Sequence, residues 1–176
     1  MNQERNKHAM TYGLLMGVVF SINFYLSTVP AISFLQYLVF VVVLVLSYRF
    51  ATNCRDKVCG GVMSYGSALF YIVQLFSYAA LILALFKYIF YTLLAPNYLD
   101  SLLELFIQIM DEAGLSNTMF GDTPFVEMFE KVITPLNLSL QSIWVNILYG
   151  LIVGLIMAAF VKKEKSIFED KTEVEA

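Results

Sequence analysis

Three long stretches of the chain carry no charged side chain and no histidine: residues 9–48, 58–86 and 132–161. A helix that crosses a hydrocarbon core of about 30 Å needs about 20 mostly apolar residues, because each residue rises 1.5 Å. The first stretch is long enough for two crossings, with a break at Pro30. The charge gaps therefore predict an all-α integral membrane protein with four transmembrane helices, over about 9–29, 31–48, 62–86 and 135–161.

The composition agrees with this fold class. Hydrophobic residues make up 59% of the 176 residues and charged residues 14%, whereas soluble domains average about 25% charged. The net charge of −3 and the lack of a basic stripe argue against a nucleic-acid partner. We expect one membrane domain over residues 1–165, with the lipid bilayer as its first partner, and an acidic mobile tail over 166–176.

The basic residues are distributed unevenly about the predicted helices. Nine of the 11 Lys and Arg residues lie on one side: Arg5, Lys7, Arg49, Arg55, Lys57, Lys162, Lys163, Lys165 and Lys171. The other side holds Lys87 and Lys131 with seven acidic residues. Cytoplasmic loops carry the excess of Lys and Arg, so both termini are expected in the cytoplasm.

The one long segment between predicted spans covers about 96–134. Apolar residues recur at helical spacing from Tyr98 to Ala113, acidic residues occupy the opposite face, and Gly114 ends the pattern. A second short helix is expected from Thr123 and Pro124, and Thr134 with Pro135 repeats that start signal. We expect an amphipathic helical insert in the periplasm. It either covers the outer ends of the spans or meets a partner.

Lys87 follows the apolar part of the third span, among several tyrosines. The interpretation favoured by this position is a side chain that reaches the outer interface, where aromatic residues also gather. The alternative is a lysine inside the bundle that serves a gate or a substrate.

Small residues spaced by four occur in the first and fourth spans. They are Gly13, Gly17 and Ser21 in the first, and Gly150, Gly154 and Ala158 in the fourth. This spacing places small residues on one helix face, where two backbones can approach closely. The stripes predict packing within the monomer, of the first helix against the fourth, or alternatively a homodimer contact.

The candidates for chemistry are few, since the predicted spans contain no Asp, Glu, His or Arg. His8, the single histidine, precedes the first span and by itself supports neither a metal site nor a triad. Cys54 and Cys59 lie in a predicted cytoplasmic loop, where we expect ordinary reduced thiols. The sequence predicts no catalytic, cofactor-binding or metal-binding residue, and no enzyme activity.

Several short patterns together resemble a known family. They are Tyr12-Gly13-Leu14-Leu15-Met16-Gly17 at the start of span one, Tyr48-Arg49 at the end of span two, and Lys87-Tyr88-Ile89-Phe90-Tyr91 before Pro96. An acidic insert, a fourth span and a basic end follow. The chain resembles a bacterial four-span membrane family known only as a domain of unknown function (DUF4199-like). The resemblance implies the bacterial inner membrane, and no known activity.

Two functions remain open at this stage. The small-residue stripes and the amphipathic insert favour a non-enzymatic structural or interaction subunit that packs with itself or with another membrane protein. The alternative is a small transporter or channel subunit that uses Lys87 and the uncharged polar residues of the spans, which are Asn23, Gln36, Gln74, Gln141 and Asn146.

Overall fold

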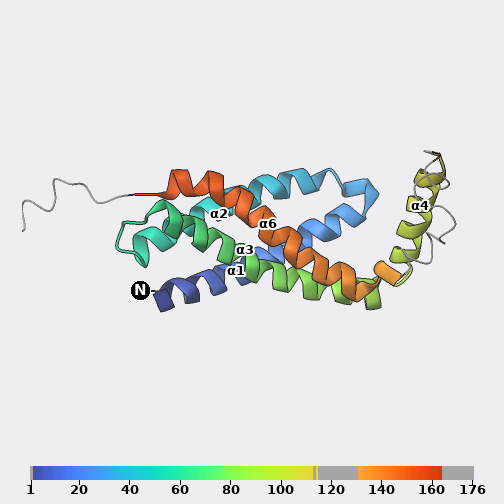
Figure 1. The fold of residues 1–176 in the computed structure, drawn as a ribbon, viewed down its shortest axis with the longest axis horizontal. Coiled ribbons are helices and arrows are strands. Elements are labelled where there is room, and N and C mark those ends of the chain that lie inside the picture. Colours follow the sequence, from blue (N-terminus) through green and yellow to red (C-terminus); the bar gives the residue numbers. More distant parts are fainter. Residues whose placement is uncertain (1, 113, 115–130, 164–176) are drawn as a thin grey trace, which may run out of the picture. The chain divides into compact units, whose positions relative to one another are not determined.

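The computed structural model describes residues 2–112, 114 and 131–163, and this part of the chain is helical with no strand (Figure 1). The α-helices are α1 (Asn2–Thr28), α2 (Leu35–Lys57), α3 (Tyr65–Ile89), α4 (Tyr98–Glu112) and α6 (Pro135–Val161). A 3₁₀ turn covers Pro30–Ile32, and a π-helical turn, Phe90–Leu94, extends α3. Four segments are long and apolar enough to cross a membrane: Gln3–Thr28, Leu35–Lys57, Tyr65–Leu94 and Pro135–Val161. The prediction of an all-α, four-span membrane protein is confirmed.

The helix ends differ from the predicted spans at several points. The first helix begins at Asn2 rather than near residue 9, so Glu4, Arg5 and Lys7 belong to its first turns. Pro30 starts the 3₁₀ turn between α1 and α2, and α2 then continues to Lys57 rather than ending near residue 48. The fourth long helix begins at Pro135, where the Asn137 amide donates to Thr134 Oγ1 at 3.3 Å and satisfies one of the open donors of the first turn.

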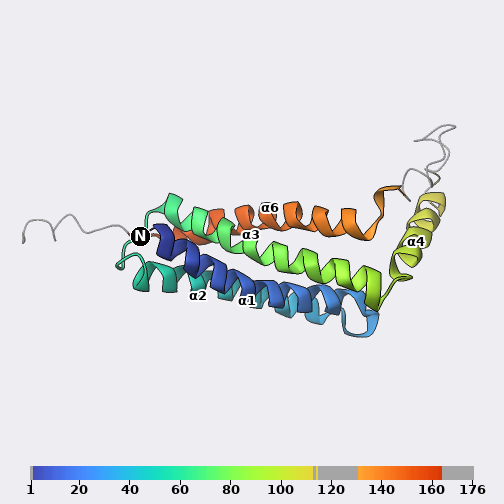
Figure 2. The same ribbon diagram turned by 90° about the horizontal axis from the view of Figure 1, so that it is seen from below.

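The chain forms two compact units, which are described separately. Unit 1 consists of Met1–Ile82 and Val145–Ala176, and unit 2 of Leu83–Trp144. In unit 1, α1 packs along α2 (Figure 2). The helix α3 contributes several large side chains to the core, since Tyr71, Ile72, Leu75 and Phe76 are fully buried. Large apolar side chains are exposed on the outside of α1, α2 and α6, as lipid-facing helices require.

Unit 2 contains the π-helical turn and α4. The rings of Phe90, Tyr91 and Tyr98 lie within 6.1 Å of one another, centroid to centroid. The helix α4 ends before Gly114, whose φ of +65° is a conformation that glycine adopts without strain. The second predicted insert helix, at Thr123 and Pro124, and the predicted acidic tail at 166–176 lie outside the described residues.

Candidate functional site: the polar end of unit 1

The ends of four helices meet at one end of unit 1 (Figure 1), which we call the polar end. The backbones of Met63, before α3, and Lys163, after α6, exchange two hydrogen bonds of 2.9 Å. Arg55 Nη1 donates to the carbonyl of Val161, the last residue of α6, at 3.0 Å. These bonds attach the end of α2 and the α2–α3 connection to the end of α6. They also satisfy a carbonyl that a helix end leaves open.

A histidine-centred hydrogen-bond network joins three helices at the polar end. His8 Nδ1 on α1 lies 2.8 Å from the Tyr71 hydroxyl on α3. His8 Nε2 lies 3.4 Å from Asn53 Nδ2 on α2, and the same amide nitrogen donates to the Tyr12 hydroxyl at 3.0 Å. The His8 ring also packs on Tyr12 at 4.3 Å between centroids. Both ring nitrogens are therefore engaged, which assigns His8 a structural part at this end.

In the neutral tautomer of His8 that carries its proton on Nδ1, Nε2 accepts from the Asn53 side-chain nitrogen and Nδ1 donates to the Tyr71 hydroxyl.

Two of the sequence interpretations at this end are wrong. His8 is not in a tail before the first span, because α1 already includes it. Cys54 is not in a loop: it lies in α2 and is fully buried, while Cys59 follows in the turn, and both are free thiols. No three His, Cys, Asp or Glu side chains in the described part of the chain gather in a metal-binding arrangement.

Two hollows open beside the His8 network. The larger has a volume of about 560 Å³ and lies against the last turns of α2; it is lined by Tyr12, Tyr48, Arg49, Phe50, Thr52, Asn53, Asp56 and Lys57. The smaller, of about 200 Å³, is lined by Glu4, Lys7, His8, Thr11, Tyr12 and Val58. Tyr12 lines both hollows, His8 lines the smaller and Asn53 the larger.

The small-residue stripe of α1 packs against α3. A Cβ atom added at Gly13 would lie 2.6 Å from the Tyr78 Cβ, and one added at Gly17 would lie 2.6 Å from the Ile82 Cβ. Non-bonded carbon atoms do not approach so closely, so the neighbouring atoms would have to shift. Ser21 continues the stripe, is buried, and donates its hydroxyl to the Gly17 carbonyl at 2.9 Å.

The stripe of α6 also packs against α3. A Cβ at Gly150 would lie 2.5 Å from the Phe76 Cβ, and one at Gly154 would lie 2.9 Å from Leu69 Cδ1. Ala158, further along, is fully buried. The structure thus pairs both stripes with the third helix, and not with each other as the sequence interpretation had it.

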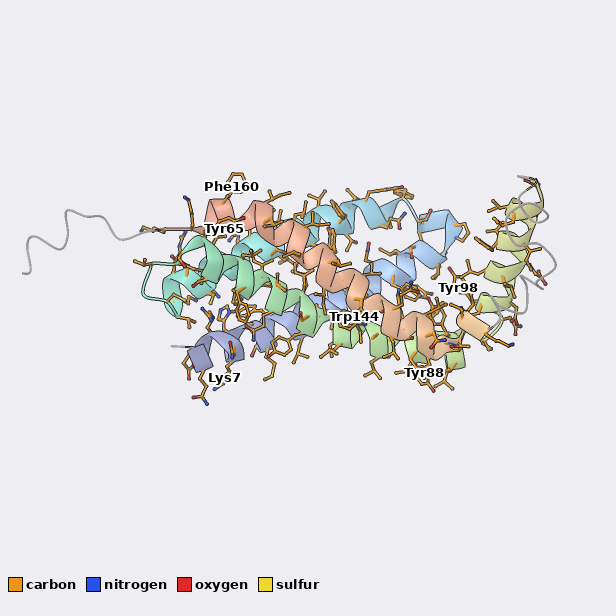
Figure 3. All side chains as sticks on the ribbon, in the orientation of Figure 1. Lys7, Tyr65, Tyr88, Tyr98, Trp144 and Phe160 are labelled. Atoms are coloured by element: carbon orange, nitrogen blue, oxygen red, sulfur yellow. The ribbon has the colours of Figure 1, made fainter. Side chains whose placement is uncertain are left out.

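The two stripes occupy different sides of α3. Tyr78 and Ile82 meet α1, whereas Leu69 and Phe76 meet α6. At about 100° per residue, these two sets are centred roughly 150° apart around the helix. Further along the α6 side, Tyr65 donates its hydroxyl to the Leu155 carbonyl at 3.0 Å, and Phe160 projects outward from α6 (Figure 3).

The other residues that the sequence singled out are Lys87 and the uncharged polar residues of the spans. Lys87 lies in the last turn of α3, in unit 2, half-buried and just before the π-helical turn. Among the uncharged polar residues of the spans, Gln74 Nε2 is 3.5 Å from the Tyr78 hydroxyl. Gln141 is exposed and Gln36 half-buried.

The family model described as "Protein of unknown function (DUF4199)" matches residues 11–163. The chain belongs to this family. No curated protein and no solved structure matches it. The matched part begins within α1, after His8, and ends at Lys163, which is hydrogen-bonded to Met63. It therefore includes Tyr12, Asn53 and Tyr71.

Proposed function

We propose that this DUF4199 protein is a non-enzymatic subunit of the bacterial inner membrane that acts by interaction with another membrane protein or with a second copy of itself. The observation that carries the proposal is the close packing of α1 and α6 on α3 at Gly13, Gly17, Gly150 and Gly154. Helices in such contact form a tightly packed frame. A partner would then contact residues outside these helix–helix contacts.

Two further observations support this proposal. The single histidine has both ring nitrogens in hydrogen bonds with Tyr71 and Asn53, so it serves to hold α1, α2 and α3 together. The glycine stripes are used within one chain, so a partner would bind through a different surface.

The charge distribution supports an orientation with the polar end in the cytoplasm. Seven of the basic residues that the structure describes belong to this end: Arg5, Lys7, Arg49, Arg55, Lys57, Lys162 and Lys163. Positive charge of this kind is retained on the cytoplasmic side during insertion. The insert, with α4, would then lie in the periplasm.

A transporter or channel subunit is the second candidate, and one observation favours it. Asn23 Oδ1, Gln74 Oε1 and Tyr149 Oη are buried in unit 1 and have no hydrogen-bond partner among the described residues. Buried polar atoms of this kind can hold water or line a route for a solute. We rank this function second because α1 and α6, which carry Asn23 and Tyr149, pack closely on α3, which carries Gln74.

Cross-linking in native membranes tests the first proposal. A membrane-impermeant amine cross-linker is applied to spheroplasts and, separately, to inverted vesicles, and the linked peptides of the full chain are identified by mass spectrometry. We expect Lys7, Lys57, Lys162 and Lys163 to react in inverted vesicles only, and Lys131 in spheroplasts only. The same second membrane protein, or a second copy, should be linked in each preparation.

A flux assay tests the alternative function, transport of a solute. The purified chain is reconstituted in proteoliposomes and compared with its Lys87→Met variant and with empty liposomes. The proposal predicts leakage equal to that of empty liposomes for both proteins. Failure to link any protein, together with a solute flux that Lys87→Met removes, would assign transport instead.

A further inference from the structure

The larger hollow at the polar end presents two cations on one helix face. Arg49, Asn53 and Lys57 follow one another at intervals of four residues along α2 and line the hollow together. Side chains at this spacing lie above one another on one face. From α1, Tyr12 also lines the hollow.

The acidic residue in the hollow is already neutralised. Asp56 accepts from Arg55 at two points, Nε to Oδ1 at 2.8 Å and Nη2 to Oδ2 at 3.3 Å. This is the one ion pair among the residues that the structure describes, and it includes neither Arg49 nor Lys57. The hollow therefore carries an excess positive charge from two side chains that are both exposed.

Neutral groups add hydrogen-bond donors beside these cations. The Tyr12 hydroxyl accepts from Asn53, so its own hydrogen is available to donate. At the end of α2, Val58 and Cys59 both donate to the Cys54 carbonyl, and Gly61 donates to that of Arg55. The donor set suits an anion with several acceptor oxygens.

The place of the hollow in the chain indicates the source of that anion. The uncharged stretch of the first two helices ends at Tyr48, and Arg49 begins the charged part of α2. Aromatic rings of Tyr12, Tyr48 and Phe50 line the hollow at this level, as they do at membrane interfaces. Lipid phosphates lie at such interfaces, and basic pockets between transmembrane helices bind anionic headgroups.

We propose that Arg49 and Lys57, with Tyr12, bind a phosphate anion in this hollow, and that the anion is the headgroup phosphate of an anionic phospholipid. A volume of about 560 Å³ is within the usual range for small-molecule sites. The Asn53–His8–Tyr71 bonds position the wall of this site, since Asn53 holds Tyr12 in place. The proposal does not depend on the identity of any protein partner.

Lipid binding to the purified full chain tests the site. The protein in detergent micelles is titrated with dioctanoyl phosphatidylglycerol, and the lipid-bound fraction is measured by native mass spectrometry. Each basic residue near a lipid surface contributes roughly a fivefold change in affinity. We expect Arg49→Gln and Lys57→Gln to weaken binding about fivefold each, and Arg49→Lys to retain most of it.

Lys162→Gln is the matched control, because it removes the same charge from the same end without lining the hollow. It should change the affinity less than twofold, and circular dichroism should show equal helix content in all variants. Equal losses in Lys162→Gln and the two hollow variants would overturn the site, since binding would then reflect overall charge alone. Equal binding of dioctanoyl phosphatidylcholine and phosphatidylglycerol would overturn it too.

Inorganic phosphate distinguishes the two sources of the anion. If millimolar phosphate leaves the lipid bound and does not bind on its own, the lipid assignment stands. If phosphate displaces the lipid, and Arg49→Gln and Lys57→Gln weaken phosphate itself, the anion site stands and its natural ligand is a soluble phosphate compound. If neither probe responds to the two hollow variants, the proposal is wrong.

Discussion

Unit 1 contains two regions that are built on different interactions. In its middle, α3 is covered by the glycine stripes of α1 and α6, and the contacts are between apolar groups and backbone. At the polar end, α1, α2 and α3 are joined by hydrogen bonds between His8, Tyr71, Asn53 and Tyr12. The middle leaves no room for an added methyl group, whereas the polar end leaves a hollow of about 560 Å³.

This difference follows from the two surroundings, the hydrocarbon region around the middle and the water at the membrane interface. Lipid tails are as apolar as leucine, so helices in the hydrocarbon region associate through close packing rather than through burial of apolar surface. At the interface, water competes for hydrogen bonds, and charged side chains can remain exposed without a large cost. The comparison assigns stability mainly to the middle and binding to the polar end.

The largest expected effect is at a glycine of the middle. Gly150→Ala places a methyl group against the Phe76 Cβ, and overpacking of this kind costs about 1–3 kcal/mol. Gly66→Ala is the matched control, because an added Cβ at this α3 position meets nothing within 4 Å. It should be neutral or stabilising by up to about 1 kcal/mol, since alanine is the better helix former. The measurement is the free energy of unfolding in mixed micelles.

Equal stability of Gly150→Ala and Gly66→Ala would show that α6 does not rest on α3 at this position. The assignment of stability to the middle would then lose its main support.

A smaller effect is expected at the polar end. Tyr71→Phe removes the hydroxyl that lies 2.8 Å from His8 Nδ1, and the loss of one such hydrogen bond costs about 0.5–1.5 kcal/mol. Tyr37→Phe, at a tyrosine residue that is 71% exposed, is the control and should leave the unfolding free energy unchanged. A loss at Tyr71 larger than that at Gly150 would reverse the order of the two regions.

The four-span fold could be predicted from the sequence because the absence of charge over about 20 residues is itself the physical requirement for crossing a bilayer. The start of α6 was predictable from Thr134 and Pro135, where a capping hydroxyl precedes the helix. The start of α1 was not, because hydropathy detects the apolar part of a helix and not its charged first turns, at Glu4, Arg5 and Lys7.

The partner of each glycine stripe was not predictable either. Spacing by four shows which residues share a face, but it does not show which helix meets that face. Here the opposing surface on α3 is made of large side chains, such as Tyr78, Ile82 and Phe76, and these give no pattern of small residues. The His8 network was missed because Asn53 and Tyr71, which contact the two ring nitrogens, are 45 and 63 residues away from His8.

Disulfide trapping tests most directly whether both stripes close on α3 within one chain. In a background with Cys54→Ala and Cys59→Ser, the pair Ile72→Cys and Gly154→Cys is compared with the pair Gly17→Cys and Gly154→Cys. The Cβ of a residue at 154 would lie 3.6 Å from the Ile72 Cβ, which is within the range of a disulfide, about 3.5–4.5 Å.

The account predicts rapid oxidation of the first pair within the monomer, seen as a reducible shift on a gel and a loss of two hydrogens by mass spectrometry, while the second pair stays reduced. Oxidation of the second pair with the first reduced would place α6 against α1. A first pair that forms only dimers would place the stripe of α6 in a contact between chains, and either result would contradict the account.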